Sequence, residues 1–139
     1  MSRFDSDRLI IDQTLYWTVV DSEDEAVYIS GLFNSDGLDL LIKDFQPQGQ
    51  FGRRHVHELP TKVTPGFDPS LASHMAVVDA TRALLAELES IRSGPELSMI
   101  FDPARHLPSR RTAMRSRVLP SLPSYGDYDA ACRELYGLD

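Results

Sequence analysis

Apolar residues at spacings of three and four predict two short amphipathic helices early in the chain. Ser22 is followed three residues later by Glu25, which matches a capping box and predicts a helix that ends at Asn34-Ser35. Either Ser35 or Asp36 then caps a second helix that extends to Phe45. Much of the acidity in this part of the sequence therefore serves to begin two helices, where the helix dipole favours negative charge.

The longest predicted helix runs from Ser70 to about Arg92. Asp68-Pro69 forms a suitable N-cap and N1 pair ahead of it, and Ser93-Gly94-Pro95 ends it. Its apolar positions fall mainly at spacings of three and four: Leu71, Met75, Val78, Leu85 and Leu88.

Two other segments are predicted to be strands. Residues 13–20 are rich in β-branched and aromatic side chains, and residues 55–63 read as a strand interrupted by Pro60. Between the second helix and Pro60, the proline and two glycines of residues 46–55 predict a loop.

Frequent prolines mark residues 95–139, with short helices predicted near 109–119 and 128–136, the last closed by Gly137. This density of prolines favours a partly helical extension that packs on the rest of the chain rather than a core element. We therefore predict an α+β fold: one small domain with a few short strands and three to five helices. Residues 1–94 form an α/β recognition-like part and 95–139 the proline-rich extension.

The charge is unevenly distributed along the chain. Residues 1–44 hold ten acids and three bases, which gives −7, whereas residues 45–139 hold eleven of each. Twelve of the fourteen bases are arginine, the side chain suited to bidentate contacts with phosphate or guanine. Arg53 and Arg54 are adjacent, and a longer stretch without acids holds Arg105, Arg110, Arg111, Arg115 and Arg117.

The sequence contains no recognisable catalytic constellation. It has neither a glycine-rich phosphate loop after a strand nor a Gly-x-Ser-x-Gly elbow. Cys132 is expected to be a structural thiol, and His55-x-His57 has no further paired ligand nearby, so we predict no metal and no cofactor. No signal peptide or apolar run of membrane-spanning length is evident, which favours a cytoplasmic protein without membrane contact.

A succession of weak motifs resembles the target-recognition region of large adenine-specific DNA methyltransferases of restriction-modification and phage-defence systems. A helix ends in Phe33-Asn34-Ser35, where that family has a Leu-Asn-Ser-like triplet. A glycine- and arginine-containing loop over residues 49–57 and then Pro60 follow in the family's order. Pro65-Gly66-Phe67-Asp68-Pro69 with His74 is similar to the family's opening of a long helix.

The resemblance extends to Ser109-Arg110-Arg111 and the closing residues 134–138, so it covers nearly the whole chain. The family's glycine motif for the methyl donor and its Asn-Pro-Pro-Tyr or Asp-Pro-Pro-Tyr motif are both missing. The resemblance therefore implies a separate C-terminal piece, a non-catalytic subunit or fragment that joins a larger methyltransferase or defence-system subunit.

On this interpretation the loop approaches double-stranded DNA. Arg53 and Arg54 reach phosphates or a base edge, Gln48 and Gln50 pair with adenine, and the later arginines touch phosphates. The predicted DNA-binding residues are Gln48, Gly49, Gln50, Gly52, Arg53, Arg54, His55, Arg110, Arg111 and Arg115.

Three alternatives compete with this interpretation. The loop is an ordinary surface loop, and the arginines pair with the acidic first third or lie on a solvated face. Alternatively, the protein is a protein-interaction adaptor that docks a partner through its acidic front and proline-rich end. A third possibility is an acidic inhibitor or immunity-type protein that imitates DNA.

Overall fold

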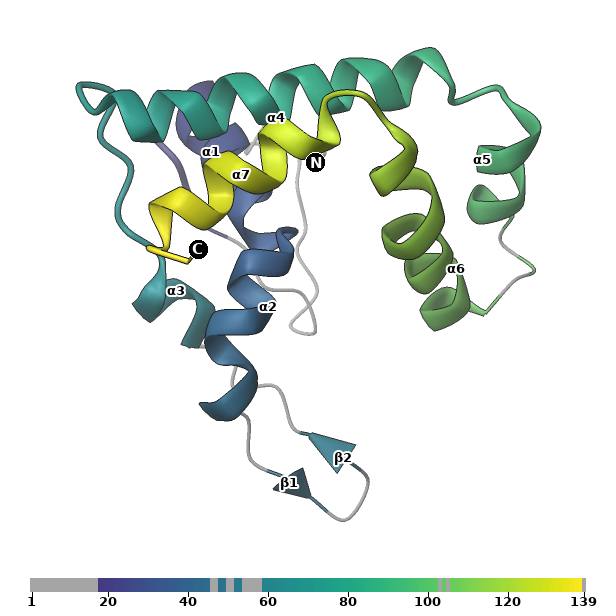
Figure 1. The fold of residues 1–139 in the computed structure, drawn as a ribbon, viewed down its shortest axis with the longest axis horizontal. Helices are drawn as coiled ribbons and strands as arrows, with labels where there is room; N and C mark the ends of the chain where they lie inside the picture. Colours follow the sequence, from purple (N-terminus) through teal and green to yellow (C-terminus); the bar gives the residue numbers. More distant parts are fainter. Residues whose placement is uncertain are drawn as a thin grey trace.

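The computed structural model describes residues 18–45, 48–49, 52–53, 59–102, 104 and 106–138, and nearly all of its regular structure is helical (Figure 1). The helices are α1 (Glu23–Phe33), α2 (Asp36–Ile42), η2 (Lys43–Phe45), α3 (Leu59–Val63), α4 (Ala72–Ser90), α5 (Pro95–Phe101), α6 (Leu107–Ala113), η3 (Met114–Val118), η4 (Leu119–Ser121) and α7 (Tyr125–Leu135). Helices η2 and η4 are 3₁₀-helices and η3 is a π-helix.

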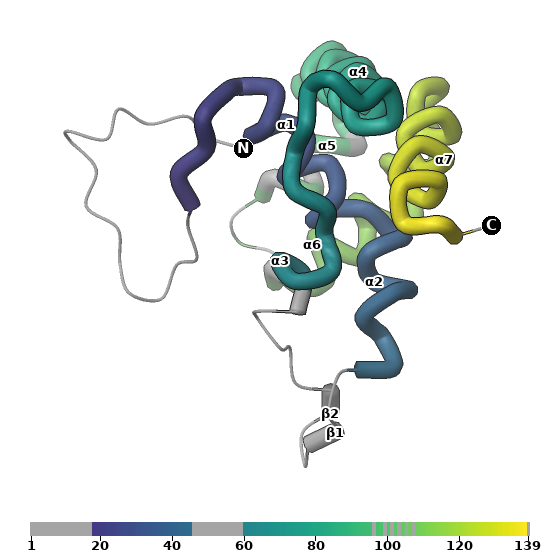
Figure 2. The backbone as a smooth tube through the Cα atoms, turned by 90° about the vertical axis from the view of Figure 1, so that its left-hand side faces the viewer, coloured from purple at the N-terminus to yellow at the C-terminus, as the bar shows by residue number. Residues whose placement is uncertain are grey.

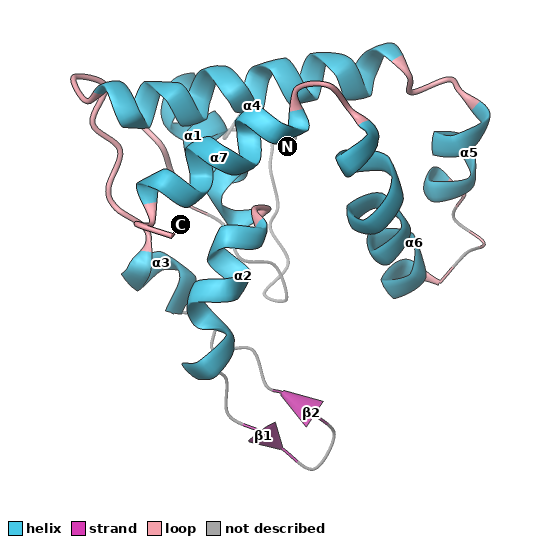
Figure 3. Ribbon diagram, in the orientation of Figure 1, coloured by secondary structure: helices cyan, strands magenta, loops and turns pink. Residues whose placement is uncertain are grey.

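The predicted α+β class is wrong, because the described part of the chain is an all-α fold (Figure 3). Its only strand pairing joins β1 (Gln48–Gly49) and β2 (Gly52–Arg53), two residues each, which form a minimal antiparallel hairpin. The strand predicted over residues 13–20 lies outside the described residues except for its last three, which are not in a strand.

The strand predicted over residues 55–63 is also wrong where it can be compared. Residues 59–63 form α3, whereas residues 55–58 lie outside the described part of the chain. Pro60 falls in the first turn of α3, where a helix needs no N–H donor, so the residue that was read as interrupting a strand instead suits a helix start.

The predicted starts of the first two helices are confirmed in atomic detail. The Ser22 hydroxyl accepts a hydrogen bond from the Glu25 backbone N–H at 3.1 Å and caps α1. The Glu25 carboxylate reaches back to the N–H of Asp21 at 2.7 Å, one residue before the partner of a strict capping box. Ser35 caps α2 by accepting from the Leu38 N–H at 3.2 Å.

The predicted long helix is confirmed as α4, although it begins two residues later than expected. Asp68 is occupied in the preceding turn, where its carboxylate accepts from both the backbone N–H and the hydroxyl of Ser70. These hydrogen bonds lower the pKa of Asp68. The His74 ring, stacked on Tyr28 with centroids 5.0 Å apart, accepts the Asp68 backbone N–H through Nδ1. The Phe-Asp-Pro…His residues thus pack the start of α4 onto α1.

The core lies where α1 and α7 flank α4 (Figure 2). Its buried side chains come from all three helices: Tyr28, Leu32, Val77, Val78, Leu84, Tyr128 and Cys132, together with Leu122. Gly31 allows α1 to approach α4 closely, because a Cβ there would lie 2.2 Å from the Thr81 Oγ1. The core therefore depends on helix-to-helix packing and on one glycine at the α1–α4 crossing.

The density of prolines predicted that residues 95–139 lie outside the core, but some of them belong to it. Tyr128 and Cys132 of α7 are buried in the same cluster as α1 and α4, so that expectation is wrong for α7. The predicted helix ending at Gly137 is confirmed, and Gly137 has a φ of 64°, which suits glycine after a helix. The division into residues 1–94 and 95–139 remains a prediction.

Prolines shape α5, α6 and the turns that follow without preventing helix formation. Pro95 and Pro108 occupy the first turns of α5 and α6, where the missing N–H costs nothing. Pro120 cannot donate to residue 116, and its ring would clash with that carbonyl, so an α-helix cannot pass through this point unbroken. The helix instead changes to the π-helix η3 and then to η4.

Candidate nucleic-acid interface

Four residues of the predicted loop form the β1–β2 hairpin, which lies beyond the end of α2, away from α4 (Figure 1). Gln48 pairs with Arg53, and Gly49 pairs with Gly52. The structure describes the backbone of these four residues. Three further predicted contact residues, Gln50, Arg54 and His55, lie outside the described part of the chain, as does His57.

The three later predicted arginines, Arg110, Arg111 and Arg115, all lie on the continuous helical stretch α6–η3, and each has a different environment. Arg110 is partly buried, and its Nε donates to the carbonyl of Ile100, which ties α6 to α5. The side chain of Arg111 is exposed and makes no hydrogen bond or ion pair with another described residue. Arg117, on η3, is exposed in the same way.

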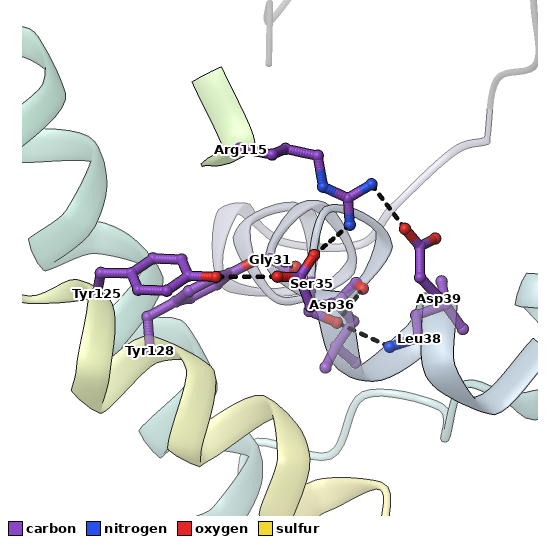
Figure 4. Close-up of polar contacts among 9 residues, drawn as sticks. Gly31, Ser35, Asp36, Leu38, Asp39, Arg115, Tyr125 and Tyr128 are labelled. Carbon is purple, nitrogen blue, oxygen red and sulfur yellow. Dashed lines mark hydrogen bonds and ion pairs between the residues drawn. The ribbon is translucent and has the colours of Figure 1, made fainter. Parts of the chain in front are cut away.

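Arg115 differs because its charge is compensated within the chain (Figure 4). One nitrogen of its guanidinium lies 2.5 Å from Asp36 Oδ1 and the other 2.6 Å from Asp39 Oδ2, both on α2. This is the pairing with the acidic first third that the sequence left open as an alternative. The side chains of Arg115, Asp36 and Asp39 are 42%, 49% and 54% exposed, so the cluster lies at the surface.

The electrostatic balance at Arg115 keeps it charged. Partial burial alone would lower the pKa of Arg115, but its hydrogen bonds to Asp39 and Asp36, with their negative charges, outweigh burial and raise the pKa. Asp36 also accepts from the Tyr125 hydroxyl through Oδ2 at 3.1 Å, so this carboxylate joins α2 to both η3 and α7 (Figure 4).

Buried hydrogen bonds hold the start of α2, which carries both acids of this cluster. Ser35 is buried, and its hydroxyl donates to the Leu32 carbonyl while it caps α2. The Tyr128 hydroxyl donates to the Gly31 carbonyl at 2.6 Å in the core nearby. The acids that hold Arg115 therefore stand on a segment fixed by buried hydrogen bonds.

Other arginines outside α6–η3 also have acidic partners. Arg82 pairs with Asp24 at 2.6 Å, and Arg92 pairs with Glu89 at 3.2 Å. Among the predicted contact residues with described side chains, Arg111 alone is exposed and unpaired. Arg117 shares these properties, but the prediction had not included it, and only its place in the acid-free stretch pointed to it.

The described residues provide no other obvious chemistry. They contain no group of three or more potential metal ligands, and none of their helices is long and apolar enough to cross a membrane. Cys132 is fully buried, and burial, with the charge of Asp129, raises the pKa of its thiol to about 12. A neutral, inaccessible thiol is a poor nucleophile, which fits the structural role expected for it.

Sequence and structure comparisons do not extend this description. The chain matches no known family, no curated protein and no solved structure.

Proposed function

We propose that this chain is a non-catalytic DNA-binding accessory domain of a larger DNA-modifying assembly. The observation that carries the proposal is the α6–η3 stretch, where Arg111 and Arg117 are exposed and have no acidic partner among the described residues. Residues 103–126 around them hold five arginines and no acid. Double-stranded DNA is a ligand whose charge complements this stretch.

Arginine suits this task because its planar guanidinium forms paired hydrogen bonds with phosphate oxygens. The net charge of −7 opposes the approach of DNA elsewhere on the molecule, so contact is confined to a local basic surface. Contacts of this kind position a protein on the duplex but do not read its sequence.

The wider context depends on the sequence resemblance alone. It supports an accessory or target-recognition role within an adenine-methyltransferase, restriction or phage-defence system, in which a larger subunit supplies catalysis. We place this role in the cytoplasm, where such assemblies meet DNA and a single reduced cysteine is ordinary.

The proposal is tested by fluorescence anisotropy of a labelled duplex at low salt. We expect Arg111→Ala/Arg117→Ala to weaken binding roughly tenfold, because two phosphate contacts are lost. The matched control is Arg82→Ala/Arg92→Ala, which removes the same charge from arginines that already have acidic partners. Equal loss in both double variants would mean that net charge alone governs binding, and a wild-type chain that binds no duplex would refute the proposal.

The hairpin is tested separately. If Arg53 and Arg54 also contact DNA, Arg53→Ala/Arg54→Ala lowers duplex affinity while the circular dichroism spectrum is retained. Unchanged affinity in this variant would restrict the interface to α6–η3.

One observation favours the adaptor alternative as a second candidate. Leu40 and Phe45, on the consecutive helices α2 and η2, are 48% and 68% exposed, and large apolar side chains mark protein contacts where they gather in an exposed patch. This candidate predicts co-purification with a catalytic subunit that is lost in Leu40→Ser/Phe45→Ser but retained in Leu85→Ser, an exposed leucine on α4. Retention of the partner by both variants would exclude this surface.

A further inference from the structure

The position of Arg115 bears on how the proposed interface is regulated. It lies on η3 between Arg111 and Arg117 in sequence, within the stretch that lacks acids. Unlike those two, it is bound by two carboxylates from α2, almost eighty residues earlier in the chain. The most basic part of the molecule therefore has one cation already occupied by an internal anion.

The two carboxylates present to Arg115 the same chemistry that DNA would. Each offers an oxygen at 2.5–2.6 Å to a different nitrogen of the guanidinium, as two phosphate oxygens do in a bidentate contact. The ion pairs are about half exposed, and exposed pairs of this kind are weak and sensitive to salt. A phosphate that reaches the neighbouring arginines can therefore compete for Arg115.

We propose that Asp36 and Asp39 are internal competitors of DNA phosphate, which mask Arg115 and set the affinity of the α6–η3 surface for duplex. This inference rests on the proposed function and adds an autoinhibitory contact to it. When DNA binds, Arg115 exchanges two carboxylate partners for phosphate oxygens, and no covalent bond changes.

Asp39 is the residue to test, because among the described residues Arg115 is the only partner of its carboxylate. Asp36 is less suitable, because it also accepts a hydrogen bond from the Tyr125 hydroxyl and its replacement would disturb two contacts. Asp39→Asn is expected to bind duplex about two- to fivefold more tightly than wild type, with a salt slope steeper by about 0.9 because one more phosphate is engaged. Asp44→Asn is the matched control, since it removes the same charge from an exposed acid on η2.

The arginine itself provides the decisive second variant. In an Arg115→Ala background, Asp39→Asn should give no gain beyond that of Asp44→Asn, because no masked cation remains to be released. The inference is overturned if Asp39→Asn and Asp44→Asn tighten binding equally, or if the gain persists without Arg115. In either case measurable wild-type binding leaves the proposed function standing, whereas failure of every chain to bind duplex refutes the proposed function itself. Circular dichroism spectra of all variants check that the fold is retained.

Discussion

Polar groups such as the Tyr128 hydroxyl are buried and hydrogen-bonded in the α1–α4–α7 core, whereas the arginines of the α6–η3 stretch are partly or fully exposed. In the core, the hydroxyls of Ser35 and Tyr128 are buried and bonded to backbone carbonyls, and the Cys132 thiol is enclosed. On α6–η3, the side chains of Arg111 and Arg117 face solvent and have no partner in the part of the chain that the structure describes. Buried polar groups need internal partners, whereas exposed cations are free to meet an external ligand.

Arg115 marks the boundary between these two regions. It belongs in sequence to the basic stretch, but its charge is matched by acids on α2. Arginines that are bunched in a sequence are therefore not equivalent: tertiary contacts decide which of them remain available. Substitutions in the core should therefore change stability, and substitutions on α6–η3 should change binding.

The largest expected effect is on the α1–α4 crossing. Gly31→Ala places a Cβ 2.2 Å from Thr81 Oγ1 and should lower the free energy of unfolding by about 3 kcal/mol, measured by urea denaturation. Gly126→Ala is the control, because nothing lies within 4 Å of a Cβ there, and it should stabilise α7 by about 0.5 kcal/mol or more. Thr81→Ala should recover much of the loss. Equal behaviour of the two glycine variants would contradict the close crossing.

Alkaline pH should also weaken the core. Burial raises the pKa of Cys132 from 9.0 to about 12 and that of Tyr28 from 10.0 to about 12, and it raises the pKa of Tyr128 as well. Because the unfolded chain loses these protons first, the stabilising contribution is complete below pH 9 and declines as pH rises toward 12. A single group costs about 1.4 kcal/mol per pH unit within its window.

Urea denaturation between pH 8 and 11 measures this decline. Cys132→Ala should show a shallower decline than the wild type, although its stability at pH 8 is lower because a buried side chain is reduced in size. A decline of the same steepness in both proteins would show that the thiol is not buried as described.

Two tyrosines on α7 allow a finer comparison. Tyr128→Phe removes a buried hydrogen bond to the Gly31 carbonyl and should cost about 1 kcal/mol, since that carbonyl also accepts from the Asn34 N–H. Tyr125→Phe removes a half-buried bond to Asp36, which keeps Arg115 as a partner, and should cost about 0.5 kcal/mol. Thermal unfolding should rank the two variants in this order, and the reverse order would count against the buried position of Tyr128.

Local sequence signals predicted the helices well and the class poorly. Caps such as Ser22 and Ser35 act within four residues, so they are visible in sequence. The strand predicted over residues 55–63 was wrong at residues 59–63, where Pro60 suits the first turn of α3 rather than interrupting a strand.

The candidate site was harder to predict. Arg115 meets Asp36 across 79 residues of sequence, a separation at which no periodicity or spacing pairs two charges. Likewise, nothing local in the C-terminal segment shows that Tyr128 and Cys132 complete the core beside α4, because their burial depends on where α7 packs. Local chemistry was therefore predictable, and long-range pairing was not.

The salt dependence of duplex binding tests the central claim most directly. We predict that the slope of the logarithm of the binding constant against the logarithm of salt concentration falls in magnitude by about 2 when Arg111 and Arg117 are both replaced by alanine, because each phosphate contact contributes about 0.9. Stability should change by less than about 0.5 kcal/mol, as expected for exposed residues without partners. An unchanged slope in a folded double variant would contradict the assignment of α6–η3 as a phosphate-binding surface.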